Sequence, residues 1–231
     1  MMFDPQYLLF MLPALALSLW ASFQTRSAFK KYSRVRAATG LTGAQAAQRL
    51  LHSAGIDDVE IVRTHGHLSD HYNPVTKKLA LSEPVYDQPS VAAIGVACHE
   101  AGHAIQHAEK YAPLWLRSLL VPTANFGSSI GYIVMVAGLI MSSANLVLVG
   151  AALFSMVLLF QVVTLPVEFN ATARAKQLVL DYGIISPQER EGVDRVLNAA
   201  ALTYVAAAVS TLLTLLYFLM RAGLLGGRRD D

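Results

Sequence analysis

His99, Glu100 and His103 form the pattern H-E-x-x-H within the run from Gly95 to His103. On a helix, positions four apart stack on one face, so the two imidazoles can direct nitrogen atoms at a single Zn²⁺ ion. Glu100 follows His99 about 100° round the helix and can take a proton from a water that the metal polarises. Residues of these types at this spacing are typical of amide hydrolysis without a covalent intermediate.

A catalytic zinc usually takes three protein ligands, so the third must come from elsewhere in the chain. The extended pattern H-E-x-x-H-x-x-G-x-x-H is excluded, because Gln106 and Glu109 occupy the Gly and His positions. His107 follows His103 by one turn, but three ligands on one straight face would spread over about 12 Å. Glu168 is the better candidate, since it follows 50 residues without charge. The alternative for Glu168 is a solvated carboxylate at a helix N-terminus.

The elements that must position these residues are set by an uneven distribution of charge. Only 15% of the 231 residues are charged, and the net charge of +2 is too small for nucleic-acid binding. Three stretches contain no charged residue or histidine, namely Pro5 to Thr25, Ser118 to Val167 and Val196 to Met220. A spanning helix needs about 20 apolar residues, and the middle stretch has room for two. We therefore predict four transmembrane helices, at 6–23, 118–140, 144–165 and 199–220.

The orientation of these helices follows from the positions of lysine and arginine. The polar segments 24–117 and 166–198 hold 15 of the 18 Lys and Arg residues. The termini hold the other three, Arg221, Arg228 and Arg229. By the positive-inside rule, both polar segments face the cytoplasm and both termini lie outside.

Segment 24–117 is predicted to be a small α+β unit. Thr42 with Gln45 indicates a capped helix that ends near Gly55. Three short β-like runs follow, at Val59 to Arg63, Leu68 to Tyr72 and Lys77 to Ser82, with a turn at Asn73-Pro74. Ser90 can cap the next helix, at 91–109, which carries H-E-x-x-H. In segment 166–198 we expect a helix from Glu168 to Tyr182 and a second one starting at Ser186-Pro187.

Three separated blocks of the sequence resemble the small bacterial membrane-bound neutral zinc metallopeptidases, the YugP-like family of H-E-x-x-H glutamate-zincins. They are Ser69 to Ser82, Ser90 to His107 and Leu165 to Ala175. The resemblance covers nearly the whole chain. It implies a zincin-like domain with one Zn²⁺ in the bacterial cytoplasmic (inner) membrane, and polypeptide substrates that include membrane proteins. By position it implies His99 and His103 as ligands, Glu100 as the catalytic carboxylate and Glu168 as the third ligand.

The resemblance also draws attention to the residues around the ligands. In the wider glutamate-zincin pattern, a carboxylate often follows the third ligand by four residues and orients a ligand histidine, where this chain has Thr172. An acidic residue usually stands two after the glutamate in the family, where this chain has Asn170. Either side chain can accept a hydrogen bond from an imidazole N–H, but neither brings a negative charge. His107 is a further candidate for a place beside the ligands.

Contacts with the substrate or the transition state are expected from His71, Tyr72 or Arg174. A strand edge at His71 and Tyr72 can pair with an extended substrate, and either side chain can stabilise an oxyanion. Arg174 follows Glu168 by six residues on the same helix and can donate to the reacting carbonyl. The alternatives are a polar cluster that ends the strand and an ordinary surface arginine.

The sequence therefore predicts a mostly α-helical membrane zinc endopeptidase that works at the cytoplasmic membrane face. One competing hypothesis is a catalytically silent zinc-binding scaffold or chaperone, which would lack Glu100 or surround zinc with four protein ligands. Another is a small zinc transporter, which would carry ionisable residues inside its spans. The presence of Glu100 and the uncharged spans argue against both. The single Cys98 excludes an intramolecular disulfide framework.

Overall fold

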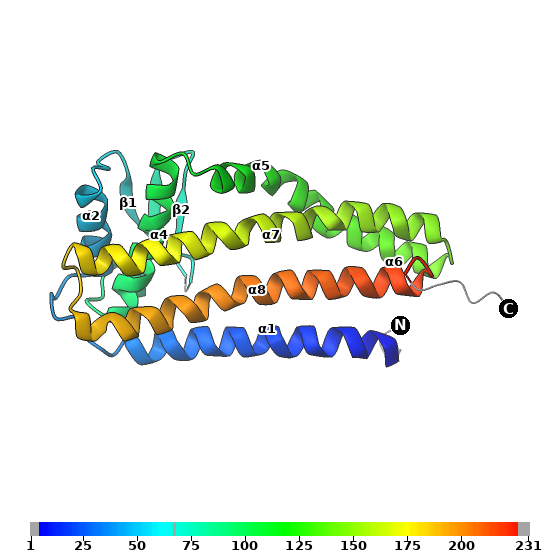
Figure 1. The fold of residues 1–231 in the computed structure, drawn as a ribbon, viewed down its shortest axis with the longest axis horizontal. Helices are drawn as coiled ribbons and strands as arrows, with labels where there is room; N and C mark the ends of the chain where they lie inside the picture. Colours follow the sequence, from blue (N-terminus) through cyan, green and yellow to red (C-terminus); the bar gives the residue numbers. More distant parts are fainter. Residues whose placement is uncertain (1–4, 67, 226–231) are drawn as a thin grey trace. The chain divides into compact units, whose positions relative to one another are not determined.

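The computed structural model describes residues 5–66 and 68–225 and is mostly helical, with a small three-stranded sheet (Figure 1). The chain divides into two compact units. The first, which we call the helical unit, comprises Met1–Trp20, Leu116–Leu165 and Tyr204–Asp231. The second, the site unit, comprises Ala21–Trp115 and Pro166–Thr203. Three long helices run through both units: α1 (Pro5–Tyr32), α7 (Ala144–Asp181) and α8 (Arg190–Arg221).

Within the described residues, four helical segments are long and apolar enough to cross a membrane. They are Pro5–Tyr32, Ala112–Ile140, Ala144–Asp181 and Pro187–Arg221. The predicted four long apolar helices and the small sheet are therefore confirmed, while the membrane limits of each helix stay predictions. The second segment is built from α5 (Ala112–Phe126), a π-helical turn (Gly127–Gly131) and α6 (Tyr132–Ile140).

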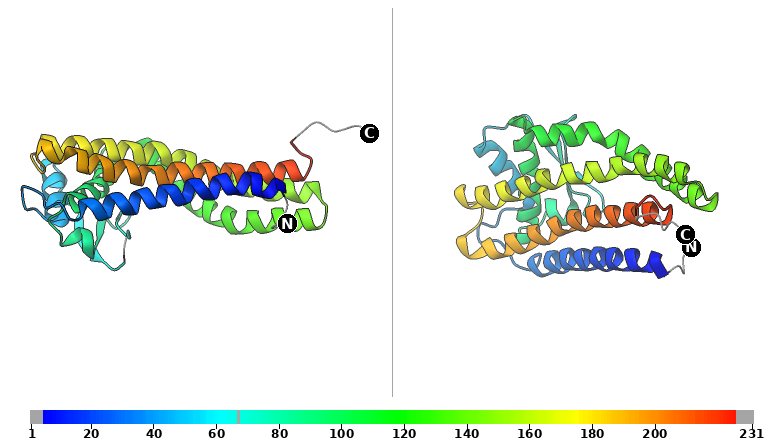
Figure 2. Two further views of the ribbon diagram at one scale, coloured as in Figure 1. Left: turned by 90° about the horizontal axis from the view of Figure 1, so that it is seen from below. Right: turned by 45° about the vertical axis from the view of Figure 1, so that its right-hand side comes forward.

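Helices of the helical unit approach one another closely, because small residues lie at their contacts. A Cβ atom on Gly138 of α6 would lie 2.6 Å from the backbone nitrogen of Val147 on α7. A Cβ on Gly150 would lie equally close to the backbone of Met135. Close backbone packing of this kind holds helices together in lipid, where the hydrophobic effect does not. Helices α1 and α8 lie side by side in both views of Figure 2, and Ser18 bonds Ser210 within this unit.

The sheet of the site unit has the strand order β1–β3–β2. Strand β1 (Glu60–Thr64) runs parallel to β3 (Lys78–Ser82), and β2 (His71–Asn73) runs antiparallel to it. Strand β2 was expected to begin three residues earlier, at Leu68. That start is wrong, because Leu68 has a φ of 58°, which no strand residue adopts.

A turn joins β2 to β3 at the predicted place. The side chain of Asn73 accepts hydrogen bonds from the backbone N–H groups of Val75 and Thr76. This is the local bond by which asparagine favours turns. The turn makes β2 and β3 a hairpin, so β2 forms one edge of the sheet.

The helices of the site unit begin at the predicted caps. Thr42 and Gln45 form a capping box before α2 (Gly43–Ser53), and Ser90 accepts a bond from the Ala93 N–H at the start of α4. Helix α3 (Glu83–Tyr86) links β3 to α4 (Val91–Ala108), which carries H-E-x-x-H. Residue Glu109, expected as the last residue of the helix, is its C-cap.

Helix α7 is one continuous element, although its apolar and polar parts were expected as a span at 144–165 and a helix from Glu168. Pro166 lies inside it. Proline lacks the N–H of one backbone hydrogen bond, but its fixed φ suits a helix. The backbone hydrogen bonds of the neighbouring residues keep the helix continuous. The next helix begins, as predicted, at Ser186 and Pro187, with the capping box of Ser186 and Glu189 and a 3₁₀ turn (Pro187–Glu189). It continues without a break as α8, which contains the predicted span at 199–220.

Helix α4 lies at the centre of the site unit's core. Its buried residues include Ile94, Ala97 and Cys98, and they pack in one cluster with residues of α2, β3, α7 and α8. Ala101, two residues before His103, and Ala104, directly after it, are also buried in this cluster. Burial on several sides fixes the rotation of α4, and hence the directions in which its histidines point.

Candidate metal centre

The three predicted ligands come together from two helices. Atom Nε2 of His99 lies 3.2 Å from Oε2 of Glu168, and Nε2 of His103 lies 3.5 Å from the same oxygen. The possible ligand atoms of all three residues lie within 4.8 Å of one another. Glu168 is 1% exposed and His103 is 6% exposed, so the group is almost closed to solvent. Such a His–His–Glu group could hold a metal ion.

Glycine at position 102 allows α4 to approach α7 at this point. A Cβ atom on Gly102 would lie 2.9 Å from the carbonyl oxygen of Ala171, closer than real Cβ contacts come. Gly102 precedes His103, and Ala171 is three residues beyond Glu168. The glycine therefore sets the distance between the two histidines and the carboxylate. The sequence indicates a close contact here, since glycine costs helix propensity, but does not name the partner.

We expect Gly102→Ala to weaken zinc binding by about tenfold or more, because the added methyl group pushes Glu168 away from the histidines. Zinc affinity measured by competition with a chelator checks this. Gly95→Ala on the same helix is the matched control, since its Cβ would meet Val193 at an ordinary 3.6 Å. Equal zinc affinity in the two variants would contradict the role given to Gly102.

The donor set fits zinc. Two imidazole nitrogens and one carboxylate oxygen are ligands that catalytic zinc sites use. The second ring nitrogen of each histidine is engaged elsewhere: Nδ1 of His103 lies 2.9 Å from Oε1 of Gln106, and Nδ1 of His99 lies 3.3 Å from the Thr172 hydroxyl. Partners on the far side of the ring are what orient a metal-ligating histidine. Both rings thus turn Nε2 toward Glu168.

The charges in the group support the same assignment. Burial alone would raise the pKa of Glu168, which lies beyond the predicted span, but hydrogen bonds from His103 and His99 hold that pKa well below its usual range. Burial lowers the pKa of His103, but the bond to Glu168 and the charges of Glu100 and Glu168 raise it overall. Glu168 is therefore an ionised carboxylate, which is the state that binds a cation.

The strand residues predicted to meet substrate point in different directions, as successive residues on a strand do. The Tyr72 hydroxyl lies 2.8 Å from Nδ1 of His107, so Tyr72 faces α4. Burial raises the pKa of Tyr72, which keeps its phenol protonated. His71 is exposed, and its Nδ1 lies 2.8 Å from the Ser69 carbonyl. Of the two, Tyr72 is on the side of the active helix.

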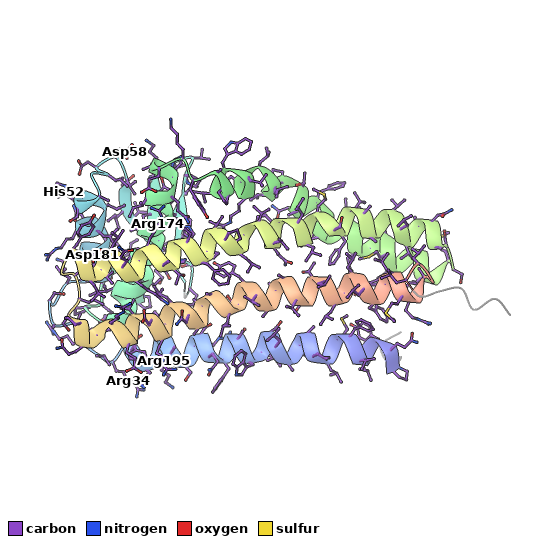
Figure 3. All side chains as sticks on the ribbon, viewed as in Figure 1. Arg34, His52, Asp58, Arg174, Asp181 and Arg195 are labelled. Carbon is purple, nitrogen blue, oxygen red and sulfur yellow. The ribbon has the colours of Figure 1, made fainter. Side chains whose placement is uncertain are left out.

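The hydrogen bonds that the described residues give Asn170 and Arg174 do not include one to an imidazole. The Asn170 side-chain oxygen accepts bonds from Gln106 Nε2 and from Arg174 Nε. Arg174, labelled on α7 in Figure 3, also places Nη2 2.6 Å from a carboxylate oxygen of Glu109. Of the two candidates that the sequence left open, Thr172 is therefore the one that contacts a ligand histidine.

Two further residues of α4 complete the description. Cys98 is fully buried, burial raises the pKa of its thiol, and it is not in the group of residues whose possible ligand atoms converge. Gln106 is fully buried and contacts His103, a role that sequence reasoning missed. The available signal was a long amide side chain on the H-E-x-x-H helix, three residues after a ligand histidine.

A family model described as "Putative neutral zinc metallopeptidase" matches residues 7–223 of the chain. The chain belongs to this family. A curated relative, "Putative membrane protease YugP" of Bacillus subtilis (strain 168), is 49% identical over 207 residues, which cover 90% of this chain and 92% of the relative. No solved structure matches. The predicted resemblance to the neutral zinc metallopeptidase family is thus confirmed.

Proposed function

We propose that the protein is a membrane-embedded zinc endopeptidase in which His99, His103 and Glu168 hold one zinc ion. The observation that carries this proposal is the convergence of the two histidines and the buried carboxylate within 4.8 Å, in a chain of the zinc metallopeptidase family. The donors come from α4 and α7, 69 residues apart for His99 and Glu168. Three protein ligands leave one position for water, as catalytic zinc sites do.

Glu100 is the general base of the proposed reaction. Bound zinc would supply Lewis acidity, which makes water a better nucleophile and polarises the peptide carbonyl. The carboxylate of Glu100 accepts a proton from the attacking water and returns it to the leaving amine. Glu100 is partly exposed on α4, so water can reach it, and its negative charge acts on the neighbouring His103.

Strand β2 is the proposed place for the substrate backbone. It forms one edge of the sheet, and an extended peptide can add to such an edge through main-chain hydrogen bonds. Tyr72 on β2 faces α4 and keeps its proton, so its hydroxyl can donate to the developing oxyanion. His71 points away from α4 and is the weaker candidate.

We propose that the site unit faces the cytoplasm. The polar segments 24–117 and 166–198 hold 15 of the 18 Lys and Arg residues, which favours that side of the membrane. Both termini then lie outside. Arg221 is at the end of α8, whereas Arg228 and Arg229 lie outside the described residues. Polypeptides near the membrane surface, membrane proteins among them, are the proposed substrates.

Metal removal tests the proposed function. The full-length protein in detergent is given an unstructured polypeptide such as casein, treated with a zinc chelator and then resupplied with zinc. We expect cleavage to stop when zinc is stripped and to return with one zinc per chain, whereas Mg²⁺ does not restore it. Cleavage that survives complete zinc removal would contradict the mechanism. A zinc-loaded protein that cleaves no polypeptide would instead favour the catalytically silent scaffold.

A further inference from the structure

The amide of Gln106 joins a ligand histidine to the helix that carries the third ligand. Gln106 lies on α4 three residues after His103 and is 0% exposed. Its Oε1 lies 2.9 Å from Nδ1 of His103, and its Nε2 lies 2.9 Å from two oxygens, the Val167 carbonyl and Oδ1 of Asn170. Every polar atom of this buried side chain therefore has a partner.

The partners fix the direction of each hydrogen bond. The Val167 carbonyl can only accept, so the end of Gln106 that faces it must be the NH₂ group. The other end, which faces His103, is then the carbonyl oxygen, and it can only accept. Nδ1 of His103 must consequently carry a proton, so a metal, which takes an unprotonated ring nitrogen, can bind His103 only at Nε2, the atom that faces Glu168.

We propose that Gln106 is a positioning residue, which holds His103 in the Nδ1–H tautomer and in the ring orientation that presents Nε2 to the metal. This inference rests on the proposed function for its metal. The carbonyl of Val167, the residue before Glu168, is the origin of the constraint. The backbone of α7, which supplies the third ligand Glu168, thus selects the tautomer of the second ligand, His103.

The same contacts continue to the end of α4. Oδ1 of Asn170 accepts from Gln106 and from Arg174 Nε, which fixes the orientation of the Asn170 amide. Arg174 also pairs with Glu109, the C-cap of α4. The chain of bonds therefore leaves α4 at Gln106 and returns to it at Glu109. Through these contacts Arg174 joins α7 to the C-terminal end of α4.

Glutamine is the residue type that this position requires. A carboxylate at position 106 would place an acceptor against the two acceptor oxygens of Val167 and Asn170. A methionine there would fill a similar volume but could neither accept from His103 nor donate to α7. Partners that orient metal-ligating histidines are worth about 10- to 100-fold in metal affinity when removed. Loss of the Gln106 amide is expected to cost that much.

The test combines zinc affinity with the state of the His103 ring in the full-length protein. Zinc affinity is measured by chelator competition for the wild type and Gln106→Met, with Gln48→Met on the exposed face of α2 as the matched control. We expect about a 10- to 100-fold weaker affinity for Gln106→Met and no change for Gln48→Met. Nitrogen-15 NMR of labelled histidine in the zinc-stripped wild type should show a proton on Nδ1 of His103, while Nε2 is the nitrogen that shares a proton with Glu168 or is free for metal.

Affinity within twofold of wild type in folded Gln106→Met would overturn the proposal. A wild-type His103 ring without a proton on Nδ1 would also overturn it, and this measurement needs no variant that must fold. A wild type that binds no zinc contradicts the proposed function, while the tautomer measurement still decides whether Gln106 orients His103. The two failures are therefore distinguishable.

Discussion

Glu100→Gln is expected to lower kcat/KM for polypeptide cleavage by about 100- to 10,000-fold while zinc stays bound. The amide has the shape of the carboxylate but cannot take a proton from water, so the variant loses the base and keeps the site. The fold is expected to persist, because Glu100 is only partly buried and lies outside the core cluster of α4. Cleavage rate and zinc content are measured on the same preparation.

The matched control for this variant is Glu191→Gln on α8. Glu191 is exposed and pairs across one helical turn with Arg195, a contact that contributes little to stability. Unchanged cleavage in the control and near-complete loss in Glu100→Gln would place the effect at the metal centre. Glu100→Gln with wild-type activity would rule out Glu100 as the base.

Glu168→Gln is expected to weaken zinc binding by more than about 100-fold, beyond the effect of losing a residue that only orients a ligand. The substitution removes the anionic ligand and leaves two imidazoles facing a buried neutral amide. At free zinc 100 times the wild-type Kd, bound zinc stabilises the folded protein by about 2.7 kcal/mol. Thermal unfolding with and without zinc should therefore show a rise in Tm for the wild type and little or none for the variant.

Thr172→Val serves as the comparison for Glu168→Gln. The Thr172 hydroxyl lies 3.3 Å from Nδ1 of His99, a long hydrogen bond to the outer side of the ring. Its loss is expected to reduce zinc affinity by about tenfold at most, and the zinc-dependent rise in Tm should remain. Glu168→Gln that binds zinc as tightly as Thr172→Val would remove Glu168 from the ligand set.

Local signals made much of this molecule predictable. The spacing of His99, Glu100 and His103 requires only a helix, and the caps at Thr42 and Ser90 each depend on residues three apart. The four long apolar helices follow from composition over about 20 residues each. Glu168 could be singled out because it is the first charge after a long uncharged stretch. All of these features are read within one element or at its end.

The parts that escaped prediction depend on how α7 is rotated against α4. Asn170 and Thr172 lie two and four residues beyond Glu168, and which of them contacts a histidine depends on this rotation. The partners of Gln106 lie 61 and 64 residues away on α7, so its role needed the packed structure. The start of β2 was missed for a different reason. Leu68 favours a strand by type, but it adopts a positive φ in the loop that leads to Asp70.

Asp70 shows what that loop provides. Its carboxylate accepts bonds from the backbone N–H and hydroxyl of Ser82 at the end of β3. The pairing of β2 with β3 is thereby fixed one residue before His71. Asp70 thus positions the strand, and Tyr72 with it.

X-ray absorption at the zinc edge tests the central claim most directly, because it reports the atoms bound to the metal in the full-length protein. The predicted result for the wild type is one zinc per chain, with two imidazole nitrogens at about 2.0–2.1 Å and oxygen ligands at about 2.0–2.2 Å. In Glu168→Gln loaded at high zinc, the carboxylate contribution should be lost. A wild type that purifies without zinc, or a shell with sulfur or with a third imidazole that Glu168→Gln leaves unchanged, would contradict the His99–His103–Glu168 site.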